Sequence, residues 1–311
     1  MTEEPLDPLT QLAMHHGTDK YGEHLYTPEY HRLFAGMRER KLRLLEIGIG
    51  GYQHLGCGGQ GLRMWADYFP NAEIVGLDLH PKQLDMPARV TIRQGAQNDP
   101  AVLDRLWAQD GPFDIVIDDG SHQVADVLAS FTQLYPLLPE GGIYVVEDTQ
   151  TALWPAYGGS PQGHGGIFEL AHRMVLGMHR LEVEVFGPVQ LELPYGDITR
   201  SVRFLRNLIV FERGENTYPS NHRFNTDHPQ VRQVLDHLNH QARRAPSPGP
   251  ALTRAKMEMS AGQLAQGALT VAKALVAFPD DPNLAATLQD PAMALRHMPQ
   301  CKGESRDQTE A

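Results

Sequence analysis

Five short apolar segments, each followed by a polar turn or a helical pattern, constrain the fold of this chain more than any other feature. Leucine, isoleucine and valine dominate them, as is typical of buried strands. The segments are residues 42–47, 73–78, 90–95, 113–117 and 143–146. Helical spacing of apolar residues follows the later ones, at 101–109 and 124–138. Strands that alternate with helices favour a doubly wound, mostly parallel α/β sheet with helices on both faces.

The fourth segment is the most informative because chemistry-bearing side chains follow it. Asp118, Asp119, Ser121 and His122 come directly after the strand predicted at residues 113–117. In open α/β sheets, ligands bind beyond the carboxyl ends of the strands. The sequence therefore predicts a functional site at this edge of the sheet.

Acidic residues also end the fifth strand, where Glu147 and Asp148 follow residues 143–146. Because sequential strands are usually neighbours, Asp119 is expected near both of them. Three converging carboxylates repel one another unless a cation lies between them. All-oxygen ligands favour a hard ion, which predicts Mg²⁺, with Mn²⁺ or Ca²⁺ as alternatives. The competing interpretation is that the three acids only cap turns and helix starts.

His122 lies three residues after Asp119 and can face the same space from the first turn of the next helix. Histidine has an ordinary pKa near neutrality, which suits a general base, and a metal-bound hydroxyl is more acidic. Because the chain has 15 histidines, a surface or packing role is the alternative. A metal-bound imidazole is a competing role, but it fits zinc or iron better than a site with three carboxylates.

A glycine-rich turn follows the first strand. Gly48, Gly50 and Gly51 allow the backbone to approach a ligand closely. Tyr52 comes next, so the third glycine of the dinucleotide fingerprint is missing, as is the Lys-Ser/Thr of a phosphate loop. The charge of Glu46 would repel a pyrophosphate. A cationic or polyhydroxylated ligand fits this turn better.

Two more strands deliver polar residues to the same edge. Asp78 ends the second strand, where a carboxylate can accept hydrogen bonds from both hydroxyls of a ribose; a cap or turn role is the alternative. After the third strand, Gln97 or Asn98 is a candidate contact for an adenine edge.

Composition excludes several classes of protein. The 311 residues include 27 Lys and Arg against 38 Asp and Glu, a net charge of −11, which argues against a nucleic-acid partner. No stretch of about 18 apolar residues predicts a membrane span, and the acidic N-terminus has no apolar signal core. Two cysteines, Cys57 and Cys301, do not make a disulfide framework, so a cytoplasmic location is expected.

The flanking segments suggest further organisation. Polar and aromatic clusters before the first strand predict a lid over a small-molecule site, or a simple cap, with a helix at residues 28–39. Residues 198–205 and 208–212 form a β-rich pair, and residues 243–250 have the composition of a linker. Helical patterns at 252–278 and 283–288 predict an appendage that packs on the domain or on a second subunit, hence a homo-oligomer. The expected parts are a lid, a main domain, a helical appendage and a disordered tail: residues 1–40, 41–240, 251–298 and 299–311.

The ordered motifs resemble the S-adenosylmethionine- and Mg²⁺-dependent sugar O-methyltransferases of macrolide tailoring, of the mycinamicin-type 2-O-methyltransferase group. The motifs are residues 17–20, 26–28, 45–52, 76–78, 117–122 and 146–148. The resemblance spans about residues 15–213. It implies the class I methyltransferase variant of the Rossmann sheet, with an antiparallel last strand.

The same resemblance implies roles for individual residues. His122 would be the general base, Asp78 would bind the ribose, Gln97 would lie by the adenine and Asp118 beside the methionine portion. The other implied cofactor contacts are Thr18, Glu46, Ile47, Gly48, Gly50, Gly51 and Tyr52. The implied metal ligands are Asp119, Glu147 and Asp148.

The resulting hypothesis is a methyltransferase of antibiotic biosynthesis that acts on a sugar hydroxyl of a small-molecule glycoside. A metal-dependent catechol or phenol O-methyltransferase is the first alternative. A non-catalytic, cofactor-binding assembly subunit is the second. A nicotinamide-dependent oxidoreductase fits less well, because it leaves the three carboxylates unexplained.

Overall fold

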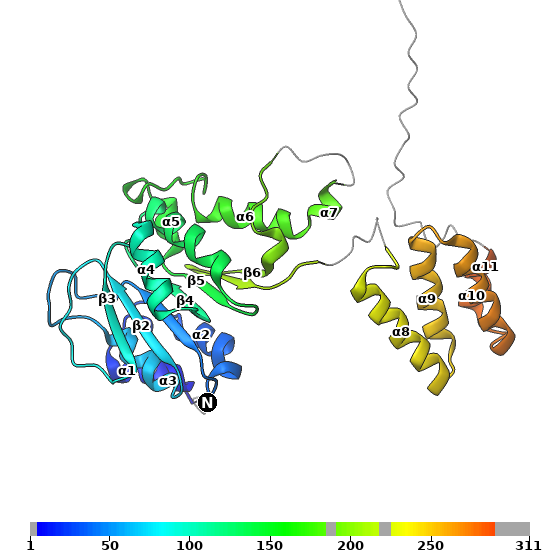
Figure 1. Ribbon diagram of the computed structural model, residues 1–311, viewed down its shortest axis with the longest axis horizontal. Coiled ribbons are helices and arrows are strands. Elements are labelled where there is room, and N and C mark those ends of the chain that lie inside the picture. Colours follow the sequence, from blue (N-terminus) through cyan, green and yellow to red (C-terminus); the bar gives the residue numbers. More distant parts are fainter. Residues whose placement is uncertain (1–4, 185–190, 218–224, 290–311) are drawn as a thin grey trace, which may run out of the picture. The chain divides into compact units, whose positions relative to one another are not determined.

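A seven-stranded sheet forms the centre of the unit that contains residues 5–178 and 192–216 (Figure 1). The computed structural model describes residues 5–184, 191–217 and 225–289. The strand order is β3-β2-β1-β4-β5-β7-β6, with β1 to β5 parallel and β7 antiparallel to both of its neighbours. The strands are β1 Arg43–Ile47, β2 Glu73–Asp78, β3 Val90–Gln94, β4 Ile115–Asp118, β5 Ile143–Val146, β6 Thr199–Leu205 and β7 Leu208–Arg213. The predicted sheet, including its antiparallel closing pair, is confirmed.

Helices cover both faces of this sheet (Figure 1). The α1–α3 helices pack on one face and α4–α6 on the other. They are α1 Pro8–His16, α2 Thr27–Phe34, α3 Gln60–Tyr68, α4 Pro100–Asp110, α5 Val124–Leu134 and α6 Ile167–Met178. Short 3₁₀ segments add η1 Ala35–Met37, η2 Tyr135–Leu137, η3 Thr149–Leu153, η4 Pro155–Tyr157 and η6 Gly196–Ile198. The predicted helices at 28–39 and 124–138 thus end in 3₁₀ turns.

The first helix, α1, was not predicted, although its start carries a recognisable signal. The Asp7 side chain accepts a hydrogen bond from the backbone N–H of Thr10, and Pro8 occupies the first helical position. An acidic cap followed by proline is typical of a helix N-terminus. The helix packs its apolar side, including Leu9 and Ala13, into the core beside α3.

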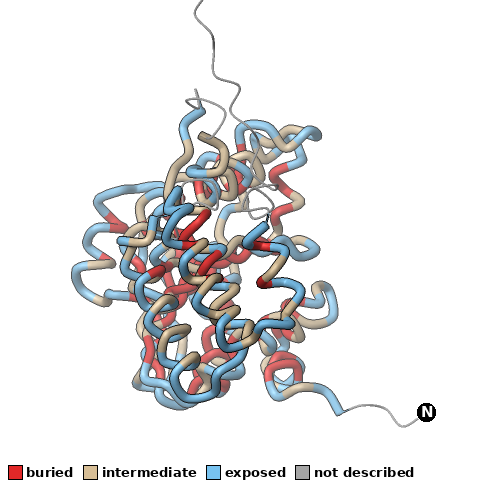
Figure 2. The backbone as a smooth tube through the Cα atoms, turned by 90° about the vertical axis from the view of Figure 1, so that its right-hand side faces the viewer, coloured by how far each residue is buried: buried red, intermediate tan, exposed pale blue. Residues whose placement is uncertain are grey.

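Burial along the strands follows their place in the sheet. Figure 2 colours the backbone by burial and shows buried stretches (red) among exposed ones (pale blue). The central strands β4 and β5 are buried at every position, whereas most residues of the edge strands β3 and β6 are partly or fully exposed. Strands buried on both faces are expected where helices cover both sides of a parallel sheet. The carboxyl ends of β1, β4 and β5 therefore lie in the best-packed part of the fold.

The chain divides into two compact units, residues 1–178 with 192–216 and residues 179–191 with 217–311. The first unit ends at residue 216, whereas the main domain was expected to extend to residue 240. The second unit contains α7 Arg180–Val183, α8 Pro229–Arg244, α9 Pro248–Ser260, α10 Leu264–Ala277 and α11 Pro282–Gln289. A small core joins three of these helices, with Ala255, Met259, Val271 and Leu284 fully buried.

Two expectations for this second unit are wrong. The pattern at 252–278 is not one helix, because Gly262 takes a φ of +77° between α9 and α10. The linker predicted at 243–250 is also mostly helical, since α8 runs to Arg244 and α9 begins at Pro248. The tail predicted to be disordered, 299–311, lies outside the described residues. None of the described helices is long and apolar enough to cross a membrane.

Candidate active site

A buried lysine binds acids at the carboxyl edge of the sheet. Lys20 is 1% exposed, and its Nζ atom lies 2.6 Å from Asp119 Oδ2 and 2.9 Å from Glu147 Oε1. Glu46 Oε1 lies 3.4 Å from the same nitrogen. Tyr30 donates a hydrogen bond of 2.6 Å to Glu147 Oε1. Three acids from three parts of the sheet thus share one fixed positive charge.

The alternation of side chains along the strands explains why these acids meet. Residues two apart in a strand lie on the same face. Glu46 belongs to β1, while Asp119 and Glu147 directly follow β4 and β5. Their predecessors by two positions lie in the core under α1–α3: Leu44, Ile117 and Val145. All three acids consequently emerge on the face where Lys20 lies.

Burial and mutual repulsion make this cluster electrostatically unbalanced. Burial raises the pKa of Glu147 well above its usual value, and repulsion from Asp119 raises it further against the attraction of Lys20. Burial likewise raises the pKa of Glu46 to about 7 and raises the pKa of Asp119. Burial lowers the pKa of Lys20, but attraction by the three acids outweighs this effect and raises it well above the usual value. The acids therefore outweigh the lysine, and a further cation would stabilise their charged forms.

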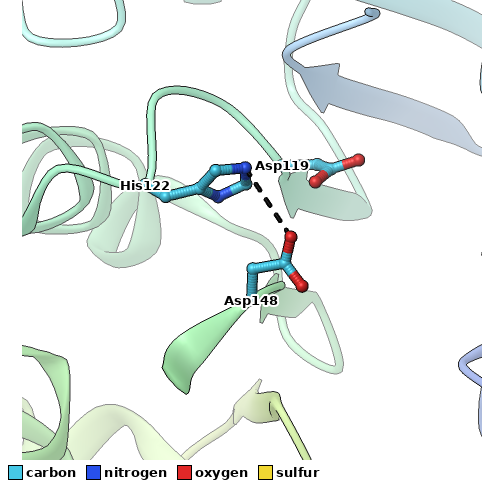
Figure 3. Close-up of side chains that lie close together, drawn as sticks. All are labelled: Asp119, His122 and Asp148. Atoms are coloured by element: carbon cyan, nitrogen blue, oxygen red, sulfur yellow. Dashed lines mark ion pairs between the residues drawn. The ribbon is translucent and has the colours of Figure 1, made fainter. Parts of the chain in front are cut away.

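A second group of side chains surrounds Asp148 (Figure 3). The Nε2 atom of His122 lies 3.7 Å from Asp148 Oδ2, and the Nε2 atom of His24 lies 3.7 Å from Asp148 Oδ1. Tyr26 donates a 2.6 Å hydrogen bond to Oδ1 and stacks on the His24 ring. Burial acts to raise the pKa of Asp148, but the hydrogen bonds from Tyr26 and Gln150 and the nearby His24 and His122 together lower it.

His122 and Asp148 both occupy unusual backbone conformations. Their φ angles are +57° and +50°, in the left-handed region that non-glycine residues rarely adopt. Such conformations cost about 1–3 kcal/mol and persist where the surrounding structure enforces them. The two turns are thus held in the shape that directs these side chains toward each other.

The donor atoms fit a hard divalent ion. One ligand atom each from Asp119, His122 and Asp148 lie within 4.8 Å of one another. The carboxylate of Glu147 is instead engaged by Lys20 and Tyr30. The carboxylate oxygens of Asp119 and Asp148, combined with the excess negative charge, favour Mg²⁺ or Mn²⁺, whereas an imidazole ligand would suit zinc or iron better. Of the three predicted metal ligands, Asp119 and Asp148 therefore lie close to His122. The third, Glu147, instead accepts hydrogen bonds from Lys20.

The glycine turn after β1 needs its glycines for close backbone packing. A Cβ atom on Gly48 would lie 2.1 Å from the carbonyl oxygen of Asp119. One on Gly51 would lie 2.2 Å from the carbonyl oxygen of Cys57. Gly48, Gly50, Gly51 and Tyr52 all have positive φ, which only glycine tolerates easily over several residues. The turn presses directly against the segment that carries Asp119.

Two side chains from the end of β2 and the loop after it hold this turn. Asp78 Oδ2 accepts a 3.2 Å hydrogen bond from the backbone N–H of Ile49, and Oδ1 accepts one from His80. Lys82 Nζ donates to the carbonyl oxygens of Gly50 and Tyr52, both at 2.6 Å. Asp78 thus lies at the glycine turn and fixes the backbone there, and its contact with a ribose stays a prediction.

Asp118 and Gln97 lie on the opposite face from Lys20 and bond to other protein groups. Asp118 accepts hydrogen bonds from Ser130 at 2.6 Å, Tyr144 at 3.0 Å and Gln97 at 2.9 Å. The Gln97 Oε1 atom accepts a 2.7 Å hydrogen bond from the Ser121 N–H. These bonds fasten the turn after β4 that carries Asp119 and His122.

The remaining predicted cofactor residues differ in their surroundings. Thr18 is 8% exposed, and its hydroxyl lies 3.9 Å from the sulfur of Met64. Ile47 is 2% exposed and packs in the core under α4–α6. Tyr52 is 81% exposed. Only the backbone of Ile47 is therefore available at the turn, whereas Tyr52 is open to solvent.

Sequence reasoning assigned no role to Lys20, His24, Tyr26 or Tyr30, although all four approach the predicted acids. Their common signal is a polar and aromatic stretch, residues 17–30, without a core-facing period. The charge balance offered a second signal, because converging acids need a buried cation. Neither signal specifies which acid each side chain contacts.

An apolar hollow borders His122 and Glu147. Its wall includes Val124, Val127 and Ile167. Its volume is about 10 Å³, room for little more than one water molecule, so the hollow marks an apolar flank of the imidazole and is too small to hold an acceptor. The hollow lies next to the imidazole and on the side of α5 and α6.

Comparison with known proteins identifies relatives of the chain. No protein-family model matches it. It is 48% identical over 152 residues to mycinamicin VI 2''-O-methyltransferase of Micromonospora griseorubida, covering 49% of this chain and 38% of that protein. It is 40% identical over 212 residues to 8-demethyl-8-alpha-L-rhamnosyl tetracenomycin-C 2'-O-methyltransferase of Streptomyces olivaceus, covering 67% and 55%. The chain thus spans about half or less of the length of these curated relatives.

A solved structure decides the fold class. The MycE methyltransferase of the mycinamycin biosynthetic pathway, in complex with Mg, SAH and mycinamycin VI, matches with a TM-score of 0.62 at 36% identity. The match covers 70% of this chain and 57% of that one. The chain has the fold of a class I methyltransferase. Its homologues are sugar O-methyltransferases of antibiotic biosynthesis, so the resemblance predicted from the motifs is confirmed.

Proposed function

We propose that this chain is an S-adenosylmethionine- and Mg²⁺-dependent O-methyltransferase that acts on a sugar hydroxyl of a glycosylated secondary metabolite. The observation that supports this most is the acid cluster with His122 at the carboxyl edge of a methyltransferase sheet. The relatives named above are methyltransferases of glycosylated antibiotics, and MycE binds Mg and SAH.

The proposed cofactor residues lie around the glycine turn. Glu46, Asp78 and the turn between them would hold S-adenosylmethionine, with Asp78 on the ribose. The negative charge of Glu46 suits a cofactor that carries a positive sulfur. Gln97 and Asp118 support the turn after β4, and their contacts with the cofactor stay a prediction.

The proposed metal ligands are Asp119, Glu147 and Asp148. When bound, a divalent ion supplies Lewis acidity at the acceptor oxygen, and the cofactor supplies an electrophilic methyl group. His122 would accept the proton of the acceptor hydroxyl at Nε2. Asp148 lies 3.7 Å from that nitrogen, too far for a hydrogen bond, and its charge stabilises the positive charge that the imidazole gains.

The metal role has a direct test. Asp119→Ala, or an excess of chelator, should abolish methyl transfer to the acceptor glycoside, while calorimetry should show that S-adenosylmethionine binding largely survives. Asp104→Ala is the matched control, because Asp104 is an exposed acid of α4 whose side chain bonds to Gln133. Methyl transfer at full rate in excess chelator would show that the metal role is wrong.

A phenol acceptor is the second candidate, because the same cluster of Asp119, His122 and Asp148 would serve an aromatic hydroxyl group. A phenol is more acidic than a sugar hydroxyl and depends less on a base. On a glycoside, His122→Ala should lower kcat by about 10²–10⁴-fold, the usual contribution of a general base. Activity of this variant on a phenol, without activity on glycosides, would favour the phenol. A cytoplasmic location and a homo-oligomer stay predictions.

A further inference from the structure

Lys20 is a buried charged residue that bonds to two acids of the site, and the proposed reaction gives it no role. It is 1% exposed, and its ammonium group contacts both oxygens of Glu147, at 2.9 and 3.0 Å, and Oδ2 of Asp119 at 2.6 Å. These are two of the three acids proposed to bind the metal ion. A fixed positive charge thus bonds to the same carboxylates as the ion would.

The contacts of Glu147 show why the two cations compete. Its Oε1 atom accepts hydrogen bonds from both Tyr30 and Lys20, and its Oε2 atom accepts a second bond from Lys20. A carboxylate that turns an oxygen to a divalent ion must therefore weaken its bonds to the ammonium group. The ion also repels that group directly, because both are positive and share Asp119.

The structure provides another partner for the displaced ammonium group. Glu46 also lies beside Lys20, with Oε1 at 3.4 Å from Nζ. Its Oε1 atom already accepts a 3.2 Å hydrogen bond from the Trp65 indole. Its Oε2 atom is buried and has no hydrogen-bond partner, an arrangement that is costly in a protein interior.

The geometry points to Lys20 as a positioning residue that shares Asp119 and Glu147 with the divalent ion. Without the ion, the lysine holds the two carboxylates together and prevents their repulsion from opening the site. With the ion bound, the ammonium group moves its main contact to Glu46. This inference rests on the proposed metal site.

Substitution of the lysine tests this competition. Lys20→Met keeps a long side chain and removes the charge. It should bind Mn²⁺ at least about tenfold more tightly than wild type, measured by electron paramagnetic resonance, because a unit charge beside the ligands is lost. The metal-free variant should also melt at a lower temperature, and Mn²⁺ should raise its melting temperature more than that of wild type. Lys41→Met is the matched control, since it removes the same charge from an exposed position before β1.

Each outcome decides the question. Equal or weaker Mn²⁺ binding by Lys20→Met would overturn the competition while leaving the metal site intact. Absence of Mn²⁺ binding by both wild type and Lys20→Met would overturn the metal site and the inference together, whereas binding by Lys20→Met alone would support the competition. If Lys20→Met does not fold, a Mg²⁺ titration of wild type decides. A saturable change in Trp65 fluorescence, absent in Trp65→Phe, supports transfer of the lysine to Glu46, and an unchanged emission overturns it.

Discussion

Alanine substitutions at two glycines, Gly48 and Gly50, test how the glycine turn positions Asp119. Gly48 and Gly50 both occupy the left-handed region, with φ of +81° and +73°. Their surroundings differ. A Cβ atom on Gly48 would lie 2.1 Å from the Asp119 carbonyl oxygen, whereas one on Gly50 would meet only Gly58, at 3.9 Å. Alanine at either position carries the same backbone penalty, but only Gly48→Ala forces two backbone segments apart.

The expected magnitudes follow from these contacts. A left-handed alanine costs about 1–2 kcal/mol, which is the whole effect expected of Gly50→Ala. Gly48→Ala adds the cost of overpacking, typically about 1–3 kcal/mol. The neighbour is main chain and cannot rotate away. The Asp119 segment is also tied to β1 by a 2.9 Å hydrogen bond from its N–H to the carbonyl oxygen of Ile47. Gly48→Ala should therefore lose about 2–5 kcal/mol of unfolding free energy.

Urea denaturation at constant m-value measures both free energies of unfolding. Mn²⁺ titration of the two folded variants adds a functional measure. Movement of Asp119 should lower the affinity for Mn²⁺ more in Gly48→Ala than in Gly50→Ala. Free energies of unfolding that agree within about 0.5 kcal/mol, the usual scatter of surface substitutions, would refute the close approach of the glycine turn to the Asp119 segment.

Three further predictions address charge and hydrogen bonding around the site. Because burial raises the pKa of Glu46 from 4.5 to about 7, the folded state binds more protons than the unfolded state in this window. The metal-free protein should therefore lose on the order of 3 kcal/mol of stability from this group between pH 4.5 and 7, measured by urea denaturation, and a flat profile would contradict it. Asp118→Asn should cost about 1–3 kcal/mol in the same assay, since an amide N–H₂ replaces an acceptor of Ser130 and Tyr144; unchanged stability would contradict it. Lys82→Met should raise KM for S-adenosylmethionine with little change in kcat, because it frees two carbonyls of the glycine turn; a loss confined to kcat would argue against this role.

The sheet was predictable because its central strands are buried on both faces and therefore read as continuous apolar segments. The second unit was less predictable. Its helices are rich in alanine, and Gly262 ends one helix where helical spacing alone continues through it. The α8 helix was missed since most of its residues are exposed and only Val231 is buried, so little apolar periodicity marks it.

For the site, the sequence identified the acids at the strand ends but not their pairing. Alternation along the strands would have separated Asp118 from Asp119, because adjacent residues point to opposite faces. The structure indeed bonds Asp118 to Ser130 and Tyr144 on one face and Asp119 to Lys20 on the other. The contact between Lys20 and acids about a hundred residues away depends on tertiary packing, which no local pattern encodes.

The N-terminal stretch of residues 17–30 completes a site whose acids come from the sheet. It supplies Lys20 and Tyr30 to Glu147, and Tyr26 and His24 to Asp148. The strands alone would place several carboxylates together without compensating charge, an arrangement that burial makes unfavourable. The lysine and the tyrosine hydroxyls offset part of this cost, and a divalent ion would offset more. The folding of the N-terminal stretch and the affinity for the ion are therefore coupled through the same carboxylates, so an ion that stabilises the acids also changes how firmly this stretch is held.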